Sequence, residues 1–364
     1  MTPRCYPFLA ALALGCAPPD DDITDDGPIL PDIAEGWTQI DPGGETICAR
    51  GTEYSFFVRK GSVNKVVVDF FGGGACWDDA TCGYAGALFA DDMDWMRDLM
   101  DAPTQPGLYD HANPDNPYAD WYHVIVPYCT GDIHWGDSVK TYGEGEEAVT
   151  IHHKGAVNTR AVLDWVFEGF SAPEEVFVTG CSAGAYGSIM WSPYFQREYP
   201  DARVAQMGDS GAGVVTEGWF AASFPSWNPD SAFPSWIPDL DPATNSYEDM
   251  VLPDLYSRIG AFYPEMQLSQ FNTLLDWNQT LYFEAMGGED AWAWSERMRA
   301  HVGGIADTIP NFSYYMADAD YHCAIVDNRL YDEATNGVKL VDWMAALSSE
   351  TPPEDVACER CEIP

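Results

Sequence analysis

The chain has 364 residues, 46% of them hydrophobic and 14% aromatic, so it is long enough for one large domain or two ordinary ones with a substantial core. Its 58 Asp and Glu residues outnumber 17 Lys and Arg residues, which gives a formal net charge of −41 at pH 7. A charge of this sign and size argues against nucleic acids and anionic membrane surfaces as partners.

The N-terminal residues have the features of an export signal. An apolar stretch over Tyr6–Leu14 is too short to span a bilayer. The sequence Ala13-Leu-Gly-Cys16 resembles a bacterial lipobox, in which Cys16 would be lipidated. We therefore expect a signal peptide over residues 1–15 and an acidic lipoprotein tether over residues 16–35. A plain secretory signal is the alternative. Either way the protein is predicted to be exported, on the cell envelope or secreted, and to contact a membrane only through that anchor.

From residue 36, predicted strands alternate with helical segments. Apolar, β-branched runs predict strands at residues 55–59, 65–71, 123–127, 176–179, 202–207 and 311–316. Residues 155–169 have helical periodicity. Buried strands separated by helices indicate an α/β fold with a mostly parallel central sheet flanked by helices, spanning residues 36–350, with a C-terminal tail at 351–364.

Residues 214–265 interrupt this alternation with a high density of Trp, Phe and Pro. We interpret them as an insertion over the strand ends, where ligands of such sheets bind. The insertion is either a partial lid or an ordinary packed peripheral subdomain.

The sequence Gly180-Cys-Ser-Ala-Gly184 follows the predicted strand at 176–179 and precedes a possible helix. In this context G-x-S-x-G forms the nucleophile elbow of an α/β-hydrolase. The sharp turn lifts the hydroxyl above the sheet and aims a helix N-terminus at the group under attack. Ser182 is therefore the predicted nucleophile.

A serine nucleophile needs a base to accept its proton and a carboxylate to orient that base. In α/β-hydrolases the acid and then the histidine follow the serine along the chain. His322, in the loop after the predicted strand at 311–316, is the predicted base. Asp276 is the predicted acid, and Asp209, at the end of the strand after the elbow, is the alternative.

The oxyanion of the reaction needs backbone N–H donors close to the serine. We expect one from Ala183, the residue after the nucleophile. The others are expected from Gly73 and Gly74, in a glycine-rich loop after the predicted strand at 65–71, because glycines let the backbone approach a substrate carbonyl closely.

Of the ten cysteines, two fall within or at the end of the predicted signal, and an even number in the remaining exported chain indicates disulfides. The pairs that we suggest are Cys181–Cys323, Cys76–Cys82 and, more weakly, Cys48–Cys129. Zinc is a rival interpretation for Cys358 and Cys361, but no second pair has ligand spacing. We expect His152 and His153 to be a solvated pair, and we predict no metal and no cofactor.

Taken together, residues 72–77, 127–136 and 180–184 resemble the pectin acetylesterase/Notum family of α/β-hydrolases, and residues 208–211 and 275–279 are similar to family blocks. The resemblance spans residues 36–345 and implies a secreted carboxylesterase. The triad that it implies is Ser182, Asp276 and His322, with oxyanion donors at Gly73, Gly74 and Ala183. The chain departs from the family pattern after the elbow alanine and after residues 208–211, so the resemblance does not transfer a substrate.

The predicted function is hydrolysis of acyl esters, above all acetyl esters of a glycan, by a monomeric serine carboxylesterase. A neutral acylated carbohydrate or another small ester suits the charge, because a chain at −41 repels polyanionic de-esterified pectin at low salt. The alternative from another class is a non-catalytic glycan- or lipid-binding surface protein on the same scaffold. Peptidase activity of the same triad is a third possibility.

Overall fold

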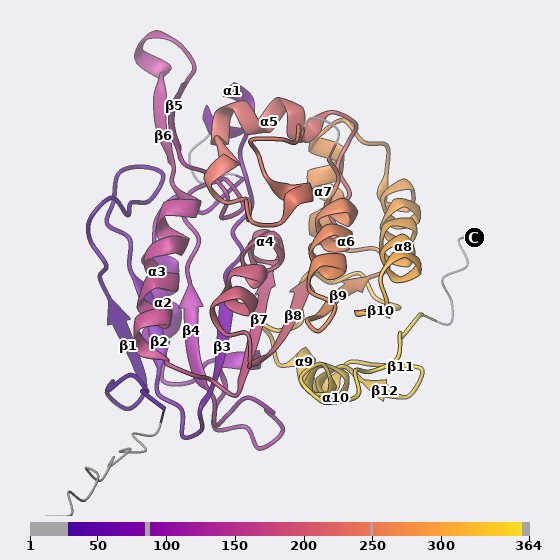
Figure 1. The fold of residues 1–364 in the computed structure, drawn as a ribbon. Helices are drawn as coiled ribbons and strands as arrows, with labels where there is room; N and C mark the ends of the chain where they lie inside the picture. Colours follow the sequence, from indigo (N-terminus) through magenta and orange to yellow (C-terminus); the bar gives the residue numbers. More distant parts are fainter. Residues whose placement is uncertain (1–27, 84–87, 248–249, 359–364) are drawn as a thin grey trace, which may run out of the picture.

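A central eight-stranded sheet organises the molecule, in the order β1-β2-β4-β3-β7-β8-β9-β10 (Figure 1). The computed structural model describes residues 28–83, 88–247 and 250–358. The strands of this sheet are β1 (Trp37–Ile40), β2 (Phe56–Arg59), β3 (Lys65–Phe70), β4 (Tyr122–Val126), β7 (Glu175–Cys181), β8 (Arg203–Asp209), β9 (Gln267–Thr273) and β10 (Phe312–Ala317). From β4 to β10 in this sheet order, each strand pairs in parallel with its neighbour. At the other edge, β1 pairs antiparallel with β2, and β2 pairs antiparallel with β4. The predicted fold class is confirmed.

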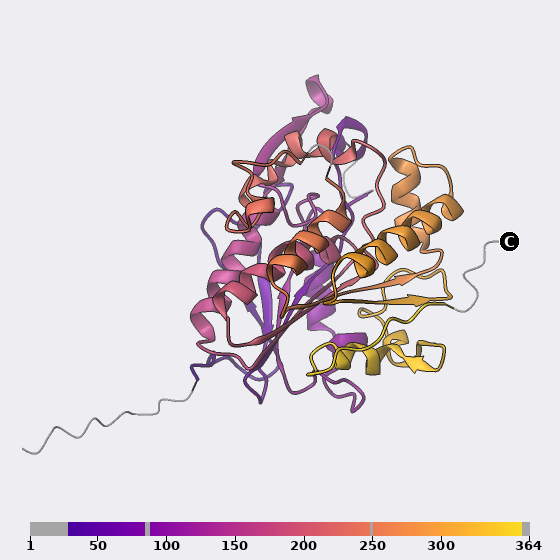
Figure 2. The same cartoon turned by 45° about the vertical axis from the view of Figure 1, so that its right-hand side comes forward.

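Helices cover both faces of the sheet. They are α1 (Asp79–Gly83), α2 (Asp94–Asp101), α3 (Gly155–Gly169), α4 (Ala183–Glu198), α5 (Trp219–Trp227), α6 (Leu252–Phe262), α7 (Trp277–Ala285), α8 (Ala291–Thr308), α9 (Arg329–Asp332) and α10 (Leu340–Ala346). Figure 2 shows the orange helices on one face of the sheet and the yellow C-terminal elements on the other. The helix predicted over 155–169 is observed with these bounds as α3.

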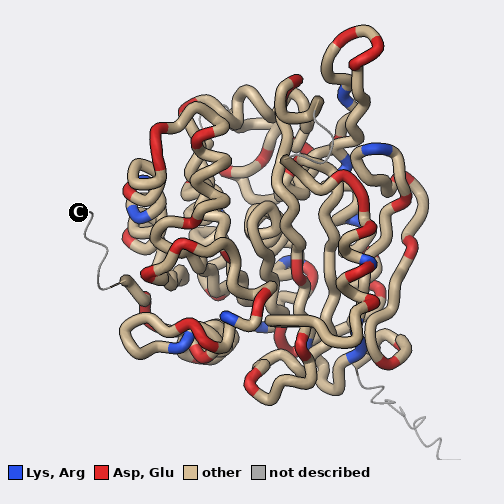
Figure 3. Tube along the Cα trace, turned by 180° about the vertical axis from the view of Figure 1, so that it is seen from behind, with Lys and Arg blue, Asp and Glu red and all other residues tan. Residues whose placement is uncertain are grey.

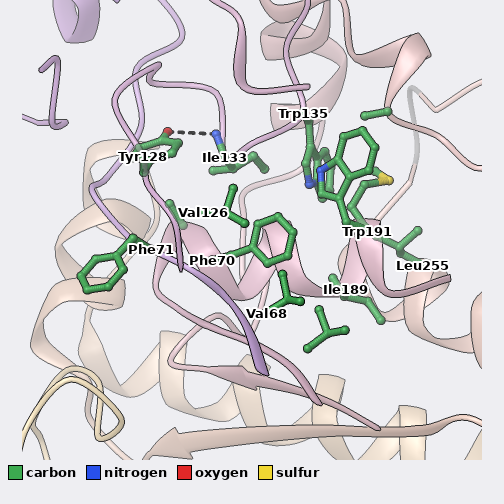
Figure 4. Packing of buried hydrophobic residues seen from close by; sticks show 14 of the residues in the cluster. Val68, Phe70, Phe71, Val126, Tyr128, Ile133, Trp135, Ile189, Trp191 and Leu255 are labelled. Carbon is green, nitrogen blue, oxygen red and sulfur yellow. Dashed lines mark hydrogen bonds between the residues drawn. The ribbon is translucent and has the colours of Figure 1, made fainter. Parts of the chain in front are cut away.

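The alternation of side chains along β3 explains the two layers. Val66 and Val68 belong to the larger core with α3, α4, α6 and α8, whereas Val67 belongs to the core with α10. Figure 4 shows Val68 and Phe70 of β3 among Val126, Ile189 and other large side chains. Because both faces are buried, β3, β4 and β7 are largely apolar, which is the pattern of a parallel sheet, whereas β9 is buried although most of its residues are polar.

The Trp- and Pro-rich segment lies at the carboxyl end of the strands, where Figure 1 shows α5 above the sheet. Its aromatic side chains are packed rather than free. Trp135 is buried in their centre, with its ring 5.9 Å from that of Phe220 and 6.1 Å from that of Phe233. α5 and the residues around it therefore cover the strand ends, whereas α6, the last part of the predicted insertion at 214–265, packs in the larger core with α4 and α8.

Two short hairpins were not predicted. β5 (Ser138–Tyr142) pairs with β6 (Val149–His153), and β11 (Ala334–Thr335) pairs with β12 (Val338–Lys339). The first hairpin projects away from the sheet in Figure 1. Short 3-10 turns complete the chain: η1 (Gly107–Tyr109), η2 (Gly145–Glu147), η3 (Pro229–Ser231) and η4 (Pro238–Leu240).

Both ends of the described chain contact the domain. Ile29 exchanges two hydrogen bonds with Ser171, and Val356 pairs with β10 through the backbone of Tyr314 and Met316. The predicted signal peptide and the predicted lipidation site Cys16 lie outside the described residues. Within the described ranges, no helix combines the length and the apolar character needed to cross a bilayer.

The structure contains the three disulfides that the sequence suggested, Cys48–Cys129, Cys76–Cys82 and Cys181–Cys323. The prediction that His152 and His153 are both solvated is wrong for His153. This side chain is fully buried and hydrogen-bonds the Tyr142 hydroxyl and the carbonyl of Thr130. Burial of β6 against the loop after β4 removes it from water, which the sequence of the hairpin alone does not reveal.

Candidate active site

Ser182 occupies a strained turn between β7 and α4. Its φ of 60° and ψ of −122° place a non-glycine residue at positive φ, as expected for a nucleophile elbow. Glycine is required on both sides, because a Cβ at Gly180 or Gly184 would collide with the carbonyl oxygen of Phe70. The turn therefore holds the serine at the end of β7, facing the loop after β3.

That loop supplies the candidate oxyanion donors. A Cβ added to Gly72 would lie 2.8 Å from the Cβ of Ser182, so only glycine allows this approach. The N–H groups of Gly73, Gly74 and Ala183 donate to no acceptor within the described parts of the chain. Three unengaged donors thus lie in the loop and helix start that flank the serine.

A buried histidine supports the same loop. His134 Nε2 lies 2.8 Å from the carbonyl oxygen of Phe71, and burial lowers the pKa of His134 to about 4. The neutral ring therefore donates to this carbonyl. His134 in turn follows Asp132, whose buried carboxylate accepts from the N–H groups of His134 and Gly155 and from the Thr130 hydroxyl. Sequence reasoning used this segment only as a family motif and missed its role in holding the glycine loop.

His322 and Asp276 form a close pair. His322 Nδ1 lies 2.9 Å from Oδ2 and 3.0 Å from Oδ1 of Asp276, and the carboxylate is fully buried. Asp276 is also the N-cap of α7 and accepts from the N–H groups of Asn278 and Gln279 at 3.0 Å. Because Nδ1–H faces the carboxylate, Nε2 is the ring nitrogen left to act as a base.

Gln279 was not identified from the sequence. Its Nε2 donates to Oδ2 of Asp276 at 3.0 Å, and its Oε1 accepts from the N–H of Ala212 at 2.8 Å. The side chain thus fixes the carboxylate against the loop after β8. An N-cap aspartate followed three residues later by Gln is a capping signal, and it could have pointed to this residue.

A disulfide links the serine and histidine loops. Cys181 precedes Ser182, Cys323 follows His322, and the bond between the two cysteines spans 142 residues of sequence. Ser182 and His322 line the same cavity, although the described side chains make no direct hydrogen bond to each other. Catalytic hydrogen bonds are often loose without substrate and tighten in the Michaelis complex.

The alternative acid, Asp209, has a different set of partners. Its Oδ2 accepts from the N–H groups of Ala324 and Ile325 at 2.7 and 2.8 Å, and its Oδ1 accepts from the Ser210 hydroxyl at 2.9 Å. The carboxylate therefore holds the backbone that follows His322 instead of the imidazole. Burial raises the pKa of Asp209 to about 6, and these hydrogen bonds oppose the rise.

Ser182 lies where two compartments meet. The smaller is about 50 Å³ and is lined by Ala183, Ile133, Trp219 and other apolar side chains. The larger is about 460 Å³ and contains His322 and the glycine loop. His322 lines the larger compartment and not the smaller one.

Two groups of Cys and His side chains are close enough to suggest a metal site. One is Cys76, Cys82 and His153, and the other is Cys181, His322 and Cys323. All four cysteines are in disulfides, so none can supply the thiolate that a metal requires. What the site offers chemically is a strained serine, an oriented imidazole and unengaged backbone donors, which is the equipment of acyl transfer.

Comparison with known proteins agrees with this geometry. Residues 41–221 match the family model described as pectinacetylesterase. Pectin acetylesterase 11 of Arabidopsis thaliana is 31% identical over 174 residues, which cover 45% of this chain and 42% of that protein. Palmitoleoyl-protein carboxylesterase notum2 of Xenopus laevis is 27% identical over 154 residues, covering 39% of this chain and 29% of that protein. The chain thus matches less than half the length of these curated relatives.

The similarity in structure extends further than the similarity in sequence. The Wnt deacylase Notum from Drosophila superposes with a TM-score of 0.61 at 19% identity, covering 86% of this chain and 93% of that chain. At this level of identity the likeness establishes the α/β-hydrolase-like fold.

Proposed function

Because this chain is a relative of the pectin acetylesterase and Notum carboxylesterases, we propose that it is a serine carboxylesterase that hydrolyses short acyl esters. The observation that carries the proposal is the 2.9 Å pair of His322 and Asp276, tied by a disulfide to the loop of Ser182. The proposed triad is Ser182, His322 and Asp276, with oxyanion donors at Gly73, Gly74 and Ala183.

The reaction proceeds through an acyl-enzyme. Ser182 Oγ attacks the ester carbonyl while His322 Nε2 takes its proton, and the oxyanion is stabilised by the backbone N–H groups. His322 then gives the proton to the departing alcohol as the carbon–oxygen bond breaks. A water molecule, deprotonated by the same nitrogen, attacks the acyl-serine and releases the carboxylic acid. Asp276 stays ionised and stabilises the imidazolium in each half.

The acyl group occupies the smaller compartment. A volume of about 50 Å³ holds only a few water molecules, which is enough for an acetyl or propionyl group and too little for a long chain. The apolar lining, which includes Trp219 and Met286, suits a methyl group. These features support the acetyl preference that was expected from the sequence.

The working environment that fits this enzyme is outside the cytoplasm. Disulfides persist in oxidising compartments, and this chain has three among its described residues. The lipid anchor at Cys16 stays a prediction. The names of the relatives describe two different substrates, pectin and a palmitoleoyl-protein, so a glycan substrate also stays a prediction.

Hydrolysis of 4-nitrophenyl acetate by the Ser182→Ala variant tests the proposal. We expect the wild type to turn over the ester and the variant to lose at least about a thousand-fold in kcat, because no other group can form the acyl-enzyme. The circular dichroism spectrum and the melting temperature of the variant serve as the folding control. A folded variant with unchanged turnover would refute Ser182 as the nucleophile.

A further inference from the structure

Resting on the proposed function, we propose that the alcohol half of the substrate is bulky and apolar. The enzyme then takes short-chain acyl esters of an aromatic or long alkyl alcohol in preference to acetylated sugars. Two features of the site lead to this proposal. His322 lies on one side of Ser182, and the two compartments at Ser182 differ in size and in lining.

The position of His322 sets which compartment receives the alcohol. The imidazole must protonate the departing alcohol oxygen, so the alcohol leaves on the side that the imidazole faces. His322 lines the larger compartment and does not line the smaller one. The alcohol half therefore lies in the larger compartment and the acyl half in the smaller.

The two compartments differ greatly in size. The larger has about 460 Å³ of space and the smaller about 50 Å³. A site that accepts a two- or three-carbon acyl group thus has room for a much larger alcohol. The candidate oxyanion donors lie at the junction, since Ala183 lines the smaller compartment, Gly73 the larger and Gly74 both.

The lining of the larger compartment is apolar. Phe71, Trp95 and Leu99 form part of its wall, together with Leu88, Phe89 and Val326. The ring of Phe71 is tilted against that of Trp95, with the centroids 5.3 Å apart, and stacks on that of Tyr109 at 5.4 Å. Trp95 keeps 37% of its surface exposed, so it offers one of its sides to a ligand.

Apolar surface continues beyond the histidine. Trp277 lies next to Asp276 in sequence, its ring is 6.3 Å from that of His322, and 60% of its surface is exposed. Leu281, one turn later on α7, is 47% exposed. An alcohol long enough to pass His322 would meet more apolar surface here, which favours burial of an apolar group.

A sugar would find few hydrogen-bond partners in this compartment. Each hydroxyl that loses its water must gain a partner, or binding is weakened by the unpaired polar group. Besides Ser182 and His322, the described lining residues with polar side-chain groups are Asn278, Tyr282 and Trp95, whose indole offers a single N–H. The Tyr282 hydroxyl already donates to the carbonyl of Leu88. The compartment therefore discriminates against a polyhydroxylated alcohol.

Acetate esters that differ only in their alcohol test this inference. We would measure kcat/KM of the wild type for benzyl acetate, for methyl acetate and for a methyl glucoside acetylated on its primary hydroxyl. Benzyl acetate should exceed the glucoside ester by at least about ten-fold, because an aromatic ring gains more than 1.4 kcal/mol from burial in an apolar site. A glucoside ester that equals or exceeds benzyl acetate would overturn the inference and leave the esterase proposal standing.

Two tryptophan variants supply a matched comparison. Trp95 and Trp292 are both 37% exposed, but only Trp95 lines the compartment. Trp95→Ala should lower kcat/KM for benzyl acetate about ten-fold and that for methyl acetate by less than about two-fold, whereas Trp292→Ala should change neither. Equal losses of Trp95→Ala on both esters would contradict the inference, and a folded wild type that hydrolyses no ester would overturn the proposed function with it.

Discussion

Two buried carboxylates at neighbouring strand ends act on one loop in different ways. Asp276 accepts from the imidazole of His322, whereas Asp209 accepts from the backbone N–H groups of Ala324 and Ile325. Asp209 also accepts, through its main-chain carbonyl, from the N–H of Ser182 at 2.8 Å. One carboxylate orients the imidazole of His322, and the other connects the backbone after His322 to the elbow.

Replacing Asp276 by Asn should separate its chemical role from its role in the helix. Asn is as good an N-cap as Asp, so α7 should stay formed. The amide cannot hold the imidazole in the required tautomer or stabilise the imidazolium, and kcat should fall by about 10³–10⁴. Stopped-flow or steady-state hydrolysis of 4-nitrophenyl acetate measures this, with the melting temperature as the folding control.

Asp209→Asn is the matched control for Asp276→Asn, because it makes the same substitution at the other buried carboxylate. Its carbonyl oxygen can still accept from the two backbone N–H groups, and its amide can donate to the Ser210 hydroxyl. We expect kcat to fall by less than about ten-fold, with a lower melting temperature because a charged acceptor is replaced by a weaker neutral one. A loss in Asp209→Asn as large as that in Asp276→Asn would contradict the distinct roles proposed for the two carboxylates.

At the residue scale, chain order and motif indicated which distant side chains would lie together, while their catalytic roles stay a proposal. The order serine, acid, histidine selected Asp276 and His322, which the structure places 2.9 Å apart. His134 was missed because its partner, the carbonyl of Phe71, is 63 residues away in sequence. No local pattern indicates which buried histidine will meet which distant backbone group.

At the scale of elements, the site is assembled from loops at one edge of the sheet. The loops after β3, β7, β8, β9 and β10 bring together the glycine run, the serine, Asp209, Asp276 and His322. The sequence predicted most of these strands because both faces are buried and the runs are continuously apolar. It did not predict β1 or the β5–β6 hairpin, and it gave β9 only as a possible strand before Asp276, because these strands contain many polar residues.

The disulfides provide a test at this scale. We compare the double variant Cys181→Ala/Cys323→Ala with Cys48→Ala/Cys129→Ala. The bonds close 142 and 81 residues, so the chain-entropy model gives similar losses of unfolding free energy, roughly 4–5 kcal/mol each as an upper value. Chemical denaturation of both variants measures these losses.

Only the first pair connects the loops of Ser182 and His322. We therefore expect kcat to fall in the Cys181/Cys323 variant by about ten-fold or more, since small displacements of catalytic groups are costly, and to stay within about two-fold in the other. Equal kcat in the two folded variants would mean that the bond stabilises the fold without positioning the base.

At the scale of the whole molecule, the most pronounced feature is the excess of acidic over basic residues. Figure 3 shows Asp and Glu positions spread along the whole chain trace, with few Lys and Arg positions among them. A net charge of −41 disfavours the compact state through repulsion that salt screens. The charge also disfavours anionic substrates, which is consistent with a neutral ester.

Buried titratable groups set the pH dependence of stability. Burial lowers the pKa of His111 to about 3 and those of His134 and His153 to about 4, from an ordinary value of 6.5. These histidines stay neutral in the folded state and bind protons on unfolding, so they remove stability as the pH falls below 6.5. Burial raises the pKa of Asp132 and Asp209 to about 6, and these two groups have the opposite effect between pH 6 and 4.

The histidine shifts are larger and more numerous than the two carboxyl shifts. In high salt, which screens the surface repulsion, the free energy of unfolding should therefore decrease as the pH falls from 6.5 toward 4. Urea denaturation at fixed ionic strength measures this directly. A free energy that stays level or rises over this interval would show that the histidines are not buried in their neutral form.

The central claim is that Ser182 is an activated nucleophile whose base is His322. Reaction of the intact protein with a fluorophosphonate, followed by peptide mass spectrometry, tests it most directly. We expect one equivalent of adduct, on the peptide containing Ser182, and a large loss of labelling rate in the folded His322→Ala variant. A folded wild type that forms no adduct, or that forms one on a different residue, would contradict the account.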